Sequence, residues 1–234
     1  MTVYGIDFSG ARDAVRRTWI TRLDDGAVTW VKREGELCAP LAQFLASAGC
    51  VVGIDAPLSL PAEMMDGGWE AWTRGFTRSF PNADAFRADC QQRSANEKKR
   101  AVEREAKVPF AAWNLRLYRQ TWRVMNELVS PLLWQGRAVV APQQSPRPGV
   151  TTIIEVCPAS TLQTLGLRVP YKGSGPQLRS AREELARAFE APAMVIDDPG
   201  GDALDSVIAA RVAAEALRAN NWHEPVPGEG RIYY

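Results

Sequence analysis

Residues 2–8, Thr-Val-Tyr-Gly-Ile-Asp-Phe, and residues 50–55, Cys-Val-Val-Gly-Ile-Asp, share the sequence Gly-Ile-Asp after an apolar run. Such runs are typical of buried parallel strands, and ligands collect at the carboxyl ends of the strands in open α/β sheets. If the two strands are parallel neighbours, they lie about 4.8 Å apart, so Asp7 and Asp55 could share one cation. The alternative for each acid is an aspartate that starts a turn after a strand.

Two further strands are predicted between these motifs, at residues 16–23 and 27–33. The chain between them contains Asp25-Gly26, which is a strong hairpin signal. Residues 37–48 carry apolar side chains at helical spacing. The order strand, strand, strand, helix, strand therefore leads from Asp7 to Asp55.

The middle of the chain differs in composition. Residues 60–135 hold five of the eight tryptophans and many lysines and arginines, and they indicate several helices without a strand. Strand character returns over residues 138–154, where the turn-rich segment 142–149 interrupts it. The remaining predictions are helices at 161–166, 177–190 and 203–219 and short strands at 193–196 and 230–234. We therefore expect one domain over residues 1–234, with residues 60–135 as a helical insertion.

The composition is that of a globular protein, with 234 residues, 46% hydrophobic residues and a net charge of +1. No run approaches the roughly 18 apolar residues that a membrane helix needs. The first residues indicate a strand and not a signal peptide. We therefore expect a cytoplasmic protein that does not associate with a membrane.

Histidine and cysteine chemistry finds little support. The single histidine, His223, lies outside any motif, so a Ser-His-Asp triad or a multi-histidine metal site is not expected. The four cysteines are widely scattered, and no pair has the spacing of a zinc site. Chemistry is therefore expected to rest on carboxylates, which suit hard cations such as Mg²⁺ or Mn²⁺.

Three more acids are candidates for such a site. Asp202 and Asp205 are three residues apart at a predicted helix start, so they share a face. The alternative is that they cap the helix and interact with its dipole. Glu155 ends a strongly apolar strand, where a carboxylate without a partner would be unfavourable to bury. The alternative to a role in the site is that Glu155 forms an ion pair with a nearby arginine.

Positive charge is concentrated in the insertion. Between Arg87 and Arg123 there are ten lysines and arginines against four acids. Arg116, Arg119 and Arg123 recur at helical spacing and predict a basic stripe, which could face the acids and bind phosphates. The alternative is a core-facing helix with a solvated basic side.

The chain resembles a family of unknown function whose members are described as predicted ribonuclease-H-like nucleases. Four motifs, in order, carry the resemblance: Tyr-Gly-Ile-Asp-Phe-Ser-Gly (4–10), Val-Gly-Ile-Asp-Ala-Pro-Leu (52–58), Ile-Glu-Val-Cys-Pro-Ala (154–159) and Gly-Asp-Ala-Leu-Asp-Ser-Val-Ile-Ala-Ala (201–210). The resemblance implies a ribonuclease-H-like α/β fold, with a mixed five-stranded sheet flanked by helices. The acids are also similar in order to those of Holliday-junction resolvases, with Asp7 on the first strand, Asp55 on the fourth, and Asp202 and Asp205 on the final helix.

The leading hypothesis is a metal-dependent nuclease or phosphodiesterase that acts on nucleic acid. Asp7 would bridge two Mg²⁺ or Mn²⁺ ions, Asp55 and Asp205 would lie on either side, and Asp202 or Glu155 would complete the shell.

Two alternatives stay open. Residues 5–10 also resemble the first phosphate loop of actin-like nucleotide phosphotransferases, in which backbone N–H groups and Ser9 would hold phosphate. The second alternative is a non-catalytic module of the same fold that binds nucleic acid or protein.

Overall fold

The amino-terminal residues form the predicted meander. The computed structural model describes residues 1–46, 49–220, 222 and 224–234, so His223 and residues 47–48 of the predicted helix lie outside it. Strands β1 (Thr2–Asp7), β2 (Trp19–Asp24) and β3 (Ala27–Arg33) pair in antiparallel fashion. Asp25 and Gly26 both have positive φ, at 48° and 85°, which suits the tight turn of a hairpin.

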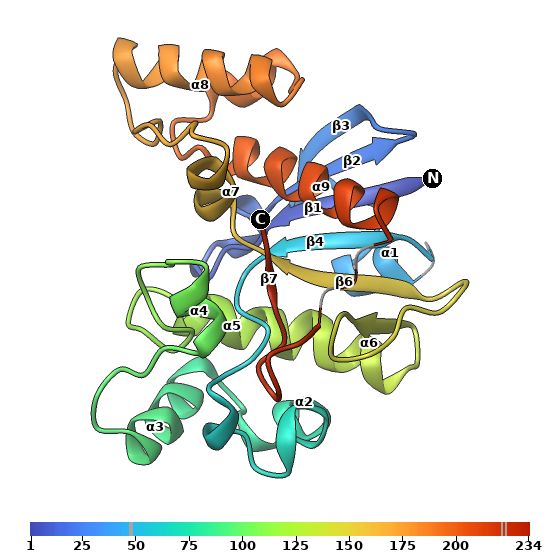
Figure 1. The fold of residues 1–234 in the computed structure, drawn as a ribbon, viewed down its shortest axis with the longest axis vertical. Coiled ribbons are helices and arrows are strands. Elements are labelled where there is room, and N and C mark those ends of the chain that lie inside the picture. The colour runs from blue at the N-terminus through green and yellow to red at the C-terminus, as the bar shows by residue number, and fades with distance from the viewer. Residues whose placement is uncertain (47–48, 221, 223) are drawn as a thin grey trace.

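Parallel strands extend the sheet on the other side of β1. Strand β4 (Val51–Asp55) lies parallel to β1, and β6 (Thr151–Val156) lies parallel to β4. Within the described residues the sheet has seven strands in the order β3-β2-β1-β4-β6-β5, with β7 on β6. The sheet is therefore mixed, and it separates two layers of helices (Figure 1).

Two sequence predictions about strands were wrong. The sheet has seven strands instead of five. The segment 138–154 forms two parallel strands, β5 (Ala138–Val140) and β6. A further short strand, β7 (Ile232–Tyr233), pairs with the carboxyl end of β6, past the residues that pair with β5. Residues 193–196 are not a strand but belong to the 3-10 helix η5 (Ala193–Asp197), which begins with a local hydrogen bond from Val195 N–H to the Pro192 carbonyl.

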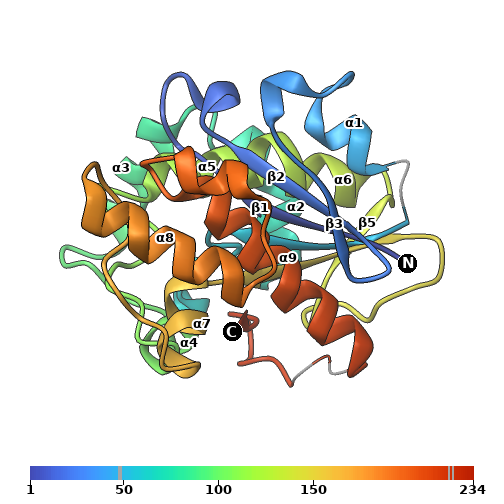
Figure 2. The ribbon, with the colours of Figure 1, turned by 90° about the horizontal axis from the view of Figure 1, so that it is seen from above.

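The helices divide between the two faces of the sheet. One face carries α7 (Pro158–Thr164), α8 (Pro176–Ala188) and α9 (Asp202–Arg218), and the views from the side and from above show α9 lying across the strands (Figures 1 and 2). The other side carries α1 (Leu41–Ala46) and the predicted insertion. The helices of the insertion are η3 (Ala62–Met64), α2 (Gly68–Ser79), α3 (Ala83–Arg93), α4 (Ala101–Glu105), α5 (Tyr118–Val124), the π-helix η4 (Met125–Val129) and α6 (Ser130–Trp134). Two short 3-10 helices, η1 (Ala14–Arg16) and η2 (Glu34–Glu36), lie in the amino-terminal part of the chain. No helix of the described residues is long and apolar enough to cross a membrane.

Two glycines let α9 approach the sheet. A Cβ atom on Gly5 would lie 2.1 Å from the carbonyl oxygen of Ser206 and 2.2 Å from the backbone nitrogen of Ala210. A Cβ on Gly53 would lie 2.5 Å from the carbonyl oxygen of Ala209. Real Cβ atoms do not come this close, so the backbone of α9 rests directly on β1 and β4. The two glycines precede Asp7 and Asp55 by two residues and share their face of the sheet.

We expect Gly5→Ala to lower the free energy of unfolding by about 3 kcal/mol or more, because the added methyl group would push α9 off the sheet. Gly75→Ala is the matched control, since outside the backbone of its own helix the nearest heavy atom to the added Cβ would be Ser79 Oγ, 3.8 Å away. In the interior of α2 that change should stabilise the fold by up to about 1 kcal/mol. Urea unfolding of both variants tests this, and equal stabilities would contradict the close contact.

Candidate metal centre

The paired aspartates occupy equivalent places on neighbouring strands. Asp7 on β1 pairs in register with Asp55 on β4, and both end their strands. Asp7 is buried, and Asp55 is half-buried. The parallel arrangement and the shared face, which the sequence predicted, are confirmed.

The start of α9 brings two more carboxylates to the same place. One oxygen from each of Asp7, Asp202 and Asp205 lies within 4.8 Å of the other two. Asp205 is buried and Asp202 is half-buried. The three therefore form a compact cluster in which each side chain offers one oxygen. Asp55 lies next to this trio without belonging to it.

A lysine and a tyrosine complete the surroundings of the cluster. Lys172 Nζ lies 2.7 Å from an oxygen of Asp205 and 3.1 Å from one of Asp202. The hydroxyl of Tyr171 donates a hydrogen bond to Asp205 at 2.5 Å. Both residues belong to the loop between α7 and α8, which buried Arg182 holds by donating to the carbonyls of Tyr171 and Gly173.

The sequence did not single out Tyr171 or Lys172, because neither lies in a motif or near the acids along the chain. A signal was nevertheless present. The stretch 171–176, Tyr-Lys-Gly-Ser-Gly-Pro, places a cationic side chain directly before two glycines, a composition typical of a structured loop at a site.

Burial and mutual repulsion shape the ionisation of the cluster. Burial raises the pKa of Asp7 well above the usual range of an aspartate, and the carboxylates of Asp55 and Asp205 add to the shift. Burial and the charge of Asp205 raise the pKa of Asp55 to about 8. Burial also raises the pKa of Asp205, against the opposing effect of Lys172. The protein therefore holds these carboxylates at a free-energy cost that a cation would reduce.

Glu155 does not lie in this cluster. Its neighbours Ile154 and Val156 pack on the α9 side of the sheet, so its own side chain points to the opposite face. There it forms a buried ion pair with Arg100, with contacts of 2.8 and 2.5 Å, and accepts a hydrogen bond from the N–H of Leu58. The alternative of an ion pair with an arginine therefore describes Glu155, and its predicted role as a metal ligand has no support.

The predicted basic stripe is divided. Arg123 is buried and forms ion pairs with Glu34 at 2.6 Å and Glu127 at 2.7 Å. It also donates to the carbonyl of Ser9. Arg123 therefore ties α5 to the loop after β1 and is not available to a phosphate.

Arg116 and Arg119 are exposed and have no ion pair within the described residues. Arg116 lies before α5, where its N–H bonds to the side chain of Asn114, and its guanidinium lies over the ring of Phe110, whereas that of Arg119 lies over the ring of Tyr118. Ser9 is half-buried, and its hydroxyl accepts a hydrogen bond from the N–H of Ala11.

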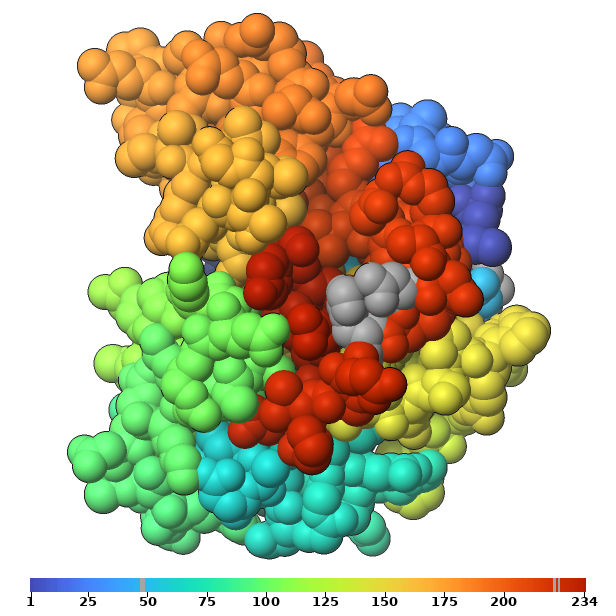
Figure 3. Space-filling view, in the orientation of Figure 1, coloured from blue at the N-terminus to red at the C-terminus, as the bar shows by residue number. Residues whose placement is uncertain are grey.

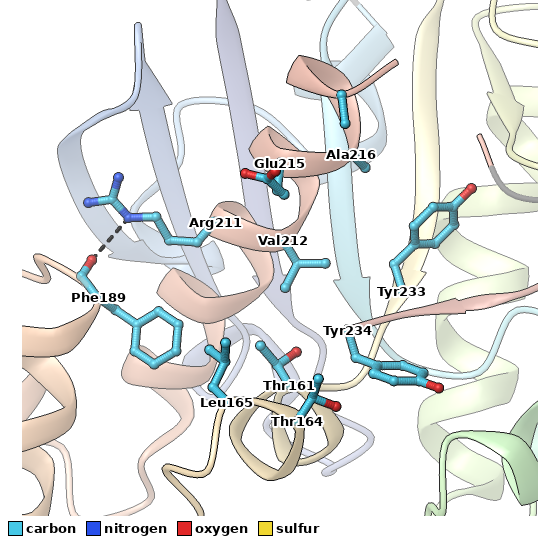
Figure 4. Close-up of a pocket in the computed structure, with 11 residues that line it drawn as sticks. Thr161, Thr164, Leu165, Phe189, Arg211, Val212, Glu215, Ala216, Tyr233 and Tyr234 are labelled. Atoms are coloured by element: carbon cyan, nitrogen blue, oxygen red, sulfur yellow. Dashed lines mark hydrogen bonds between the residues drawn. The ribbon is translucent and has the colours of Figure 1, made fainter. Parts of the chain in front are cut away.

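Two cavities differ in their relation to the cluster. One of about 160 Å³ opens beside Asp55, where residues of the insertion meet the ends of β4 and β6. A larger one, of about 330 Å³, lies between α7, α9 and the carboxyl terminus. Figure 4 shows its lining, including Arg211, which bonds to the carbonyl of Phe189. No predicted site residue lines the larger cavity, so of these two it is the cavity beside Asp55 that is associated with the acids.

We expect the melting temperature of the metal-free protein to fall as the pH rises from about 4 to about 8. An unfolded aspartate has a pKa of about 3.9, whereas the folded pKa values are raised, and that of Asp55 reaches about 8. The folded state therefore binds more protons in this window, and stability is lost as they dissociate. Thermal melts across this range check the direction.

Asp7→Asn should flatten this dependence and stabilise the metal-free fold at pH 8 by about 1 to 2 kcal/mol, because it removes one of the repelling charges. Asp66→Asn is the control, since Asp66 is an exposed carboxylate that pairs with Arg93. A marked drop in the melting temperature of Asp7→Asn would identify Asp7 as a structural partner instead.

Comparison with known proteins identifies a family. The family described as protein of unknown function (DUF429) matches residues 5–229. No curated protein and no solved structure matches the chain. The matched residues include Asp7, Asp55, Asp202 and Asp205, so the whole acidic cluster lies within the shared region. Because the match covers nearly all of the sequence, the chain belongs to the DUF429 family.

Proposed function

We propose that this protein is a metal-dependent nuclease that hydrolyses a phosphodiester of nucleic acid with Mg²⁺ or Mn²⁺. One observation carries the proposal: Asp7, Asp202 and Asp205 offer oxygens within 4.8 Å of one another, and Asp55 lies in register beside Asp7. A nuclease site of this kind needs carboxylates that converge on one or two cations. The described residues place four of them at one end of the central strands.

The donor set fits a hard divalent cation. Every candidate ligand is a carboxylate oxygen, which is what Mg²⁺ and Mn²⁺ prefer. The facing groups are Lys172, which supplies one positive charge, and the hydroxyl of Tyr171. When all four carboxylates are ionised, one ammonium leaves negative charge that further cations would neutralise.

The roles of the side chains follow from their positions. Asp7 has an oxygen within 4.8 Å of both acids of α9 and pairs in register with Asp55, so it would suit a ligand shared by two cations, with Asp205 and Asp55 as the further ligands. When bound, the cations supply an activated water and neutralise charge on the leaving oxygen. Tyr171 holds the orientation of Asp205 through its hydrogen bond. Lys172 can turn from the carboxylates to a phosphate oxygen, because its side chain is half exposed at 48%.

The topology supports a ribonuclease-H-like fold for this domain. An antiparallel meander, β1 to β3, is followed by parallel strands on the far side of β1. The acids lie on β1, on β4 and at the start of the last helix, which is the order expected from the resemblance to that fold. Fold alone does not determine the reaction, so the proposal rests on the carboxylates.

The alternatives receive less support. Actin-like phosphotransferases resemble two copies of this fold with the nucleotide between them, whereas the described residues form one sheet. A module that only binds a polyanion would gain nothing from buried carboxylates, which repel phosphate. Binding that does not depend on magnesium, without turnover, would favour such a module.

We expect Mn²⁺ to bind the protein and to support cleavage of single- or double-stranded nucleic acid. Asp7→Asn and Asp205→Asn should lower cleavage at least 100-fold and weaken Mn²⁺ binding in calorimetry, because each removes a ligand. Asp66→Asn should change neither. Tight Mn²⁺ binding by Asp7→Asn would contradict the assigned site, and ATP hydrolysis in place of nuclease activity would favour the phosphotransferase.

A second expectation concerns the exposed arginines next to the site. Arg116→Ala combined with Arg119→Ala should weaken binding of nucleic acid and reduce the slope of log affinity against log salt by about 0.7 to 0.9 per lost phosphate contact. The matched control is Arg137→Ala with Arg147→Ala, since both residues are exposed and precede β5 and β6, at the opposite ends of the strands. An unchanged slope for the first pair would leave Arg116 and Arg119 as solvated surface.

A further inference from the structure

The cavity beside Asp55 has the character of a small ring-binding pocket. It holds about 160 Å³ and lies where the insertion meets the carboxyl ends of β4 and β6. Several apolar residues from separate segments of the chain line it: Ala56, Val108, Pro109, Phe110, Leu117 and Ile232. Asp55 lines it too, so the cavity and the acidic cluster share one residue.

We propose that this pocket binds a single pyrimidine base of the substrate, from the nucleotide next to the cleaved phosphodiester. The inference rests on the proposed function, because the cations that the carboxylates would hold are what assigns a phosphodiester to the neighbouring site. Asp55 belongs to both the pocket and the group of acids, so a base in the pocket would lie next to a phosphate at the acids.

The size of the pocket selects one ring. A cavity of about 150 Å³ lined by apolar side chains holds a benzene molecule, so 160 Å³ accommodates one six-membered ring. A purine has two fused rings, and the second would remain outside the pocket or displace its walls. A pyrimidine is therefore the base that the pocket fits.

An aromatic platform is already held in place. Phe110 lines the pocket, and the guanidinium of Arg116 lies 5.0 Å from the centre of its ring. The loop that carries Phe110 is fastened on both sides, by Lys99 Nζ to the Val108 carbonyl at 2.8 Å and by the N–H of Ala111 to Glu97 at 2.8 Å. Bases of single-stranded nucleic acid stack on such rings.

Polar groups at the pocket suit the edge of a pyrimidine. Buried Arg100 donates from Nε to Glu103, from Nη1 to Ser59 and Glu155, and from Nη2 to Glu155. A guanidinium has five N–H donors and these bonds use four of them, so the fifth, on a residue that lines the pocket, is the donor that we assign to a ring carbonyl. Gln120 donates its amide N–H to the Asp55 carbonyl, which leaves its own oxygen to accept from the base.

The test measures binding of free nucleosides by ligand-observed NMR in EDTA, without divalent cations. We expect uridine and cytidine to bind at least tenfold more tightly than adenosine and guanosine. Leu117→Trp should abolish uridine binding because it fills the pocket, whereas Leu115→Trp should not, since Leu115 is 65% exposed and does not line it. Phe110→Ala should weaken uridine binding about tenfold, through the loss of one stacking partner.

Equal binding of purines and pyrimidines, or uridine binding that Leu117→Trp leaves unchanged, would overturn the proposal. If Leu117→Trp does not fold, Phe110→Ala decides, and unchanged uridine affinity in that variant overturns it. Because no divalent cation is present, the result does not depend on metal binding by the carboxylates. Uridine binding without any Mn²⁺-dependent cleavage would reject the nuclease and retain the pocket, and cleavage without uridine binding would do the reverse.

Discussion

The contact between the backbone of α9 and the two central strands governs the rest of this structure. Gly5 and Gly53 leave no side chain between the helix and the sheet, and their absent Cβ atoms would overlap backbone atoms of α9. The buried hydroxyls of Thr21 and Ser206 bond to each other at 2.7 Å across the same interface. With the helix held at this short distance, its first turn can place Asp202 and Asp205 next to Asp7. A side chain at either glycine would push the helix, and with it Asp202 and Asp205, away from Asp7.

Two buried arginines hold the insertion on the other side of the sheet. Arg100 joins Glu103 on α4 to Glu155 on β6, and Arg123 joins α5 to Glu34 and to the loop after β1. Each is hydrogen-bonded to several partners, as buried charges must be. They explain how a helical segment of mixed composition takes a defined position at the ends of the strands. Figure 3 shows the insertion, in cyan to green, meeting the carboxyl-terminal residues, in red, on the molecular surface.

The sequence allowed much of the fold to be predicted, and part of the site. The strands that end in Asp7 and Asp55 were readable because their apolar runs and their shared Gly-Ile-Asp ending are local signals. Glu155 and Arg123 were misjudged because their partners, Arg100 and Glu34, are 55 and 89 residues away, and nothing in a single sequence pairs distant charges. The contact of Lys172 with the acids of α9 was not predicted for the same reason: Lys172 lies in a loop without periodicity, far from those acids along the chain.

The distance along the chain between Asp7 and Asp205 has a consequence for biosynthesis. At about 5 to 20 residues per second, roughly 10 to 40 seconds separate the appearance of these two residues on the ribosome. From the completion of β4 until the synthesis of α9, the nascent chain has β1 and β4 but no α9, so a sheet face with two bare glycines is uncovered. Strand β7, at residues 232–233, joins the sheet later still. The acidic centre can therefore form only after the start of α9 has been synthesised: no truncated chain that ends before α9 can assemble it.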